Sequence, residues 1–147
     1  MTWDKIVKAL AALAGAIVGF VAKSWTPMLT ALAVLMTVDY ISGLIVAACH
    51  RSPNTEGGGL SSEAGFIGLA KKGFILILIL LATVLDTLID NGTSVFQSSL
   101  TLYYIANEGL SILENAGLMG VKYPEKLRKA LEAMQEREDK QPDDAEE

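Results

Sequence analysis

Long apolar runs with very few charges fill most of this 147-residue chain and constrain its fold more than any other feature. The range 28–48 holds a single charged residue, Asp39, and as a helix it rises about 31 Å, close to the hydrocarbon thickness of a bilayer. The range 73–89 likewise holds only Asp86. After residue 122 almost every second residue is charged. We therefore expect an all-α, polytopic membrane protein that ends in a solvated tail.

About four membrane-spanning helices are expected, over residues 6–22, 28–48, 73–89 and 97–119. Thr26 is placed to cap the second helix, and Pro27 suits its first turn. In the first helix Ala11, Gly15 and Gly19 recur every four residues, a pattern that lets helices approach closely in lipid. The same stretch also fits a signal peptide cleaved near residues 22–24, so retention and cleavage both stay open.

The remaining segments are polar connections. Residues 49–72 are rich in turn-forming residues and predict a loop, with Lys71 and Lys72 at the edge of the third helix. We expect residues 1–121 to form the membrane domain and residues 122–147 a charged cytoplasmic tail. Within the tail, Leu127, Ala130, Leu131 and Met134 predict a short amphipathic helix at the membrane surface or against a partner. The residues after Arg137 are expected to be disordered.

The distribution of lysine and arginine predicts the orientation. Lysines precede the first helix, and lysines and an arginine follow the fourth. The connection between the second and third helices also carries cations, among them Arg51. The two other connections hold one lysine or none. Four helices with both termini in the cytoplasm satisfy the positive-inside rule.

Four carboxylates inside the expected spans need an explanation: Asp39, Asp86, Glu108 and Glu114. Each costs roughly 2.5–3.5 kcal/mol at the centre of a membrane helix. They could be protonated, pair with Lys71, Lys72 or Arg51, bond across helices, or face water.

The spacing of Tyr104, Glu108, Ser111 and Asn115 puts them on one helix face, and Asp39 and Gly43 share a face of another. A monomeric bundle could hide such polar stripes inside. Alternatively, the stripes could drive association between subunits and then line a water-filled opening.

Other classes of function find little support in the residues. Cys49 is the only cysteine and His50 the only histidine, which is too few soft ligands for a metal site, so no metal or cofactor is expected. No basic stripe suggests nucleic acid. No set of a nucleophile, a base and an orienting group suggests an enzyme.

Four blocks of the sequence resemble the phage holins of the toxin secretion/phage lysis type, between about Leu35 and Leu131. They are LMTVDYISGLIVA, LSSEAGFIGLAKK, LATVLDTLI and YYIANEGLSILENAGLMGVKYPEKLRKAL. The most specific element is Asn-Glu-x-x-Ser-x-x-Glu-Asn followed by Gly-Val-x-x-Pro-Glu-Lys-Leu. The family-like positions are Asp39, Gly43, Ser62, Gly65, Gly68, Lys71, Lys72, Asp86, Asn107, Glu108, Ser111, Glu114, Asn115, Gly120 and Pro124.

The resemblance implies a small protein of the bacterial cytoplasmic membrane that forms homo-oligomers in the bilayer and permeabilises it. A cytoplasmic endolysin then crosses the membrane and reaches the cell wall; it need not bind the holin directly. In some loci a toxin is released instead. No catalytic residue is implied. Two other readings stay open: a small ion channel or transporter that uses the intramembrane carboxylates, and an antiholin-like regulator that binds a holin.

Overall fold

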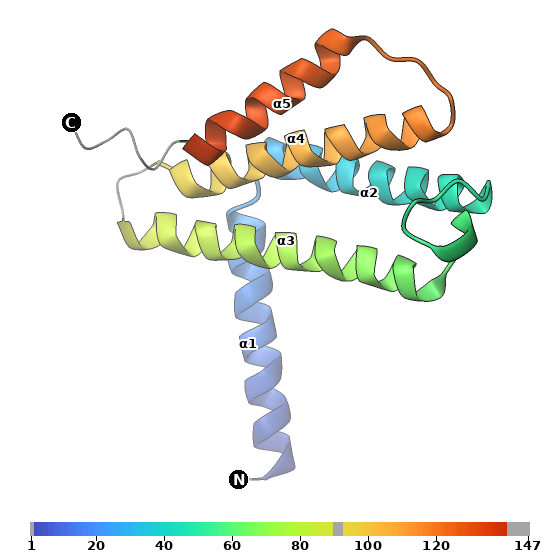
Figure 1. Ribbon diagram of the computed structural model, residues 1–147. Coiled ribbons are helices and arrows are strands. Elements are labelled where there is room, and N and C mark those ends of the chain that lie inside the picture. The colour runs from blue at the N-terminus through green and yellow to red at the C-terminus, as the bar shows by residue number, and fades with distance from the viewer. Residues whose placement is uncertain (1, 90–92, 141–147) are drawn as a thin grey trace.

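The computed structural model describes residues 2–89 and 93–140, and within these ranges all regular secondary structure is helical (Figure 1). This confirms the all-α class. The elements are α1 (Trp3–Lys23), α2 (Pro27–Ala48), the 3-10 turn η1 (Glu56–Gly58), α3 (Ser62–Ile89), α4 (Val95–Leu118) and α5 (Glu125–Lys140).

Three helices in the described part of the chain, α1, α2 and α3, are long and apolar enough to cross a membrane. The helix expected to be the fourth span, α4, is not among them. Its length would suffice, but amides, hydroxyls and carboxylates are spread along it, among them Gln97, Thr101 and Glu108. These polar groups lower its mean hydropathy and face other helices, as described below.

Helices α2, α3 and α4 lie side by side, and α5 folds back along α4 on the side away from α3 (Figure 1). Their shared core consists of Leu29, Leu32 and Met36 from α2 and Ile79 from α3. Side chains of α4, including Leu100 and Ile105, pack against this cluster. The central position of α4 is therefore set by burial of one apolar stripe, which is the usual source of helix stability in a bundle.

Helix α1 stands apart from the other helices and points away from them (Figure 1). None of its residues is buried. A methyl group added at Gly15 or Gly19 would meet no atom within 4 Å. The small-residue ridge expected at Ala11, Gly15 and Gly19 therefore contacts nothing within the described chain.

The third helix differs from its predicted bounds, because α3 starts at Ser62 rather than at residue 73. The Ser61 side chain accepts a hydrogen bond from the Ala64 amide at 3.2 Å, which stabilises this earlier start. Lys71 and Lys72 thus lie inside the helix and do not mark its edge. The loop shortens to residues 49–61, where Gly58 has φ of 74° and a Cβ there would lie 2.4 Å from the His50 carbonyl oxygen.

The predictions at two other helix ends have different outcomes. The Thr26 hydroxyl accepts a hydrogen bond from the Leu29 amide at 3.3 Å, with Pro27 in the first turn, which confirms the predicted start of α2. The amphipathic tail helix also exists, but it continues past Arg137 to Lys140, so the expected disorder is wrong for residues 138–140. Glu138, in this additional stretch, lines a cavity together with residues of α3 and α4. Residues 141–147 lie outside the described part of the chain.

Candidate functional site in the helix bundle

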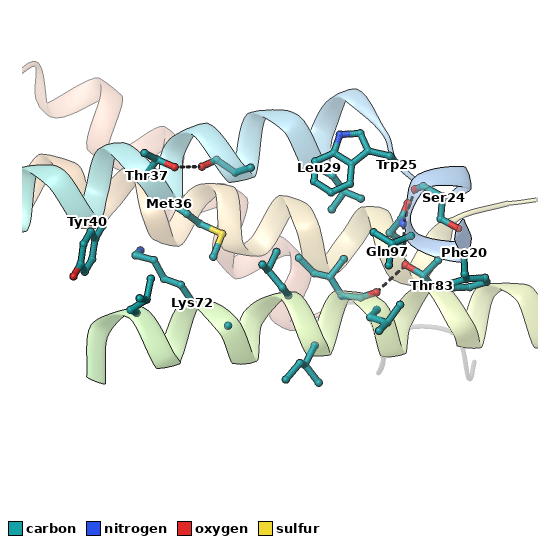
Figure 2. Close-up of a pocket in the computed structure, with 18 residues that line it drawn as sticks. Phe20, Ser24, Trp25, Leu29, Met36, Thr37, Tyr40, Lys72, Thr83 and Gln97 are labelled. Carbon is teal, nitrogen blue, oxygen red and sulfur yellow. Dashed lines mark hydrogen bonds between the residues drawn. The ribbon is translucent and has the colours of Figure 1, made fainter. Parts of the chain in front are cut away.

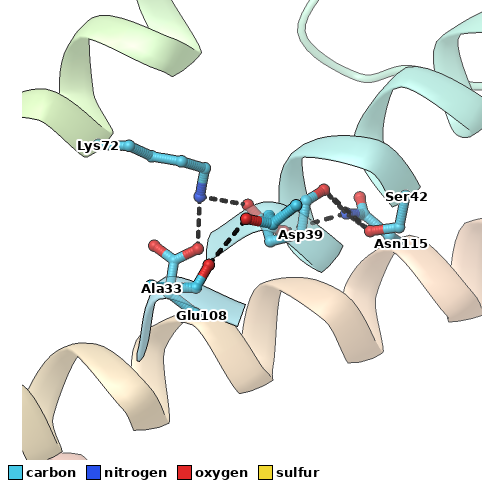
Figure 3. Close-up of polar contacts among 7 residues, drawn as sticks. Ala33, Asp39, Ser42, Lys72, Glu108 and Asn115 are labelled. Atoms are coloured by element: carbon cyan, nitrogen blue, oxygen red, sulfur yellow. Dashed lines mark hydrogen bonds and ion pairs between the residues drawn. The ribbon is translucent and has the colours of Figure 1, made fainter. Parts of the chain in front are cut away.

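Three charged side chains from three helices meet inside the bundle. The Lys72 ammonium of α3 donates hydrogen bonds to the carboxylates of Asp39 on α2 and Glu108 on α4, with 2.9 Å between Lys72 Nζ and Asp39 Oδ2 (Figure 3). The exposed fractions of the Lys72, Asp39 and Glu108 side chains are 13%, 15% and 4%. The cluster therefore ties α2, α3 and α4 together where little water reaches.

An amide and a hydroxyl extend this cluster toward the end of α4. The Asn115 amide nitrogen donates to Asp39 Oδ1 at 3.2 Å and to the Ser42 hydroxyl at 2.8 Å (Figure 3). Ser42 in turn donates to the Asp39 backbone carbonyl at 2.9 Å. Gly43 lies beside this arrangement, and a Cβ there would make an ordinary contact of 3.8 Å with the Asn115 amide nitrogen. We call Asp39, Ser42, Lys72, Glu108 and Asn115 the polar seam.

The polar seam explains how carboxylates can lie among apolar helices. One ammonium pairs with two carboxylates, so the net charge of the three ionised groups is −1. Breaking a buried ion pair leaves an uncompensated charge and is strongly destabilising, whereas the intact pair contributes little net stability. The seam therefore favours one specific packing of the three helices more than it stabilises them.

A cavity of about 410 Å³ lies beside the polar seam, toward the loop after α2. Ser111, Asn107 and Lys71 contribute to its wall. Gly65 and Gly68 of α3 also line it. A Cβ built at Gly65 would lie 3.5 Å from the Tyr40 hydroxyl oxygen, and one at Gly68 would lie 4.0 Å from the Tyr40 ring, so both positions make ordinary contacts with α2.

Both ends of α4 are held by charged side chains from elsewhere. Asp86 of α3 accepts hydrogen bonds from the backbone amides of Phe96 at 2.9 Å and Gln97 at 2.8 Å, which are free donors at the start of α4. Arg51 donates to the Leu118 carbonyl at 3.0 Å, at the end of α4. Asp86 and Arg51 thus bind helix ends, and neither belongs to the polar seam.

Asp86→Ala should lower the free energy of unfolding by about 1–2 kcal/mol, because two amides at the start of α4 lose their acceptor. Thermal unfolding in detergent measures the effect. Asp86→Asn keeps one acceptor oxygen and should lose less. Equal losses for the two variants would contradict a capping role for this carboxylate.

A larger groove of about 750 Å³ opens between α2 and α3 (Figure 2). Its wall is almost wholly apolar, with Lys72 near one end. At the other end the Gln97 amide nitrogen donates to the Thr83 hydroxyl at 2.8 Å and to the Ser24 carbonyl at 3.1 Å. These bonds fix the linker between α1 and α2, and few other polar groups converge on the groove.

The other predicted positions lie away from the seam. Glu114 is exposed. Asn107 faces α5, where its side-chain oxygen accepts a hydrogen bond from Gln135 at 3.4 Å. Sequence reasoning missed Gln97, Gln135 and the close contact at Gly109. Gln97 lies between Phe96 and Ser98, so its sequence neighbours do not indicate that it is buried, and the contacts with α5 have no sequence signature either. In the described residues no group of three or more metal-ligating side chains occurs.

Comparison with known proteins identifies the family. The model of the bacteriophage holin family matches residues 16–136, which includes the polar seam and most of α5. The chain belongs to the bacteriophage holin family. This confirms the resemblance seen in the sequence. No solved structure matches the chain.

Several relatives of this holin-family chain are bacterial. An uncharacterized 14.9 kDa protein in the nagH 3′ region of Clostridium perfringens is 40% identical over 76% of this chain and 79% of its own length. Protein Lmo0128 of Listeria monocytogenes is 36% identical over 80% and 78% of the two chains. A protein of Bacillus phage phi105 named probable holin is 37% identical over 62% of each chain. Membership makes this a holin-type membrane protein, and holins are a non-enzymatic, membrane-permeabilising family.

Proposed function

We propose that this protein oligomerises in the bacterial cytoplasmic membrane and permeabilises it, so that a cytoplasmic endolysin, or in some loci a toxin, escapes. The observation that carries the proposal is the family match over residues 16–136. The polar seam supports the proposal. Polar groups on apolar helices are stable either against another protein helix or in water, and not in lipid.

The proposed topology has four spans and both termini in the cytoplasm, with residues 1–121 as the membrane domain. Helix α4 would cross the bilayer enclosed by protein, because it packs between α2 and α3 on one side and α5 on the other. In the closed state the polar seam is covered by neighbouring helices. When enough copies of the protein gather in the membrane, the helices rearrange and the seam becomes exposed to water. Asp39 and Glu108 are the proposed pore-facing charges.

Induced expression in a bacterial host tests the function. We expect a sudden loss of membrane potential together with escape of a co-expressed cytoplasmic murein hydrolase. Potential-sensitive dye fluorescence and culture turbidity report the two events in the same cells. An inserted protein that causes neither event would contradict the proposal.

A small cation channel is a second candidate, favoured by the excess negative charge of the seam. It would dissipate the membrane potential without releasing the hydrolase. An antiholin-like regulator would do neither alone, but it would delay lysis by a co-expressed holin. The same two readouts therefore separate all three functions.

A further inference from the structure

The bundle has an apolar side and a charged side. Large exposed apolar side chains are spread along the whole of α2 and α3, for example Val38, Ile41, Phe74 and Leu81. On the described residues of α4 such side chains occur only near its two ends, at Val95, Phe96 and Leu118. The surfaces of α2 and α3 therefore suit lipid, and the middle of α4 does not.

Helix α5 covers the middle of α4. Leu131 packs on Gly109 so closely that a Cβ at Gly109 would lie 3.0 Å from a methyl carbon of Leu131. One turn further along α5, the Gln135 amide donates to Asn107 at 3.4 Å. Near its end Glu138 reaches a cavity beside Phe96 and Tyr103. Thus α5 runs along α4 toward the end of α4 that is capped by Asp86.

The outer surface of α5 requires water. Ten of its sixteen residues are charged, and Lys126, Lys129 and Arg137 are among those exposed. Arg128 Nε donates a hydrogen bond to Glu132 Oε1 at 2.8 Å. This bond raises the pKa of the Arg128 guanidinium, so the side chain stays charged. At membrane depth, charged side chains that face lipid are strongly unfavourable.

Helix α4 lies beside α2 and α3 (Figure 1). In the proposed four-span topology it therefore crosses the membrane with them, and these observations conflict if α5 faces lipid. We propose that α5 stays docked on α4 and lines the water-filled interior of the assembled opening, while α2 and α3 face lipid. The inference rests on the proposed permeabilising function and adds the outer face of α5 to the water-facing surface proposed for Asp39 and Glu108. The interior is continuous with the cytoplasm, so the tail remains in the same aqueous compartment.

A reversible crosslink tests whether α5 stays docked while the membrane opens. Gly109→Cys with Leu131→Cys, in a Cys49→Ala background, places two thiols where the native contact is closest. The purified protein is reconstituted in vesicles, and release of a trapped protein-sized dextran is measured with and without reductant. We expect the oxidised, crosslinked protein to release dextran as fast as the reduced protein.

Each outcome of the crosslink has a definite meaning. Release only after reduction would overturn the inference, because α5 would then have to leave α4 before opening. No release by the unmodified chain would overturn the proposed function itself. The two single-cysteine variants show whether either substitution alone impairs release.

A second measurement does not depend on the crosslink. Ala133 is exposed on α5, and Phe74 is exposed on the lipid-suited side of α3. In planar bilayers a bulky, charged thiol reagent should reduce the conductance of holes formed by Ala133→Cys and leave those formed by Phe74→Cys unchanged. Unchanged conductance in both variants would overturn the lining role, even if the crosslinked double variant failed to insert.

Discussion

Replacing Lys72 with methionine should cause the largest loss of stability of any single substitution in the bundle. The Asp39 and Glu108 carboxylates would lose the one ammonium partner that they have among the described residues, while remaining largely buried. Removing one member of a buried ion pair typically lowers the free energy of unfolding by about 3–5 kcal/mol. Thermal unfolding in detergent, together with the amount of membrane-inserted protein, measures the loss.

Lys71 offers a matched control for this substitution. It is the neighbouring residue and carries the same charge, but it is exposed. Lys71→Met removes the same contribution to the positive-inside rule and should leave the unfolding temperature nearly unchanged. Adding Asp39→Asn and Glu108→Gln to Lys72→Met should restore most of the stability, because no unpaired charge remains. If Lys71→Met and Lys72→Met lowered the unfolding temperature equally, the loss would come from the membrane orientation of the protein and not from the ion pairs of Lys72.

Glu108→Gln should act in the opposite direction and delay the onset of lysis. The seam then holds one ammonium and one carboxylate, and the glutamine oxygen can still accept a hydrogen bond from Lys72. Relieving the excess negative charge stabilises the closed packing of α2, α3 and α4. If opening exposes the seam to water, as proposed, a more stable closed state opens later. Culture turbidity after induction, at matched protein levels, measures the delay.

Glu114→Gln is the control for Glu108→Gln. This substitution makes the same chemical change six residues further along α4, but Glu114 is exposed and lies outside the seam. Its onset of lysis should match that of the unmodified protein. Identical timing for both variants would argue that the charge of Glu108 has no part in opening.

The sequence alone predicts the helices and the sharing of one face by Glu108, Ser111 and Asn115, because helical periodicity fixes both. The cap at Thr26 follows equally well from local chemistry. The sequence predicts the start of α3 at residue 73, eleven residues later than in the structure, because Ser62, Glu63 and Gly65 continue the turn-rich run before them. In the structure Gly65 and Gly68 lie against Tyr40, a contact between distant residues.

The partners within the site also depend on distant contacts. From the sequence, Lys72, Lys71 and Arg51 are equal candidates to neutralise the carboxylates, and only helix packing selects Lys72 for the seam and Arg51 for the end of α4. The amphipathic pattern in the tail predicts a helix at the membrane surface or against a partner, and it does not identify α4 as the surface that α5 covers. A pattern of charges shows that one face avoids lipid, but not which surface covers the other face.

The separation of α1 from the rest of the chain makes the protein modular. The buried core and the seam come from α2, α3 and α4, and α1 adds no buried residue. A product of internal translation starting at Met28 would keep these elements and lose α1 with the Thr26 cap. The packing of α2, α3 and α4 should therefore tolerate loss of α1 better than loss of any other helix.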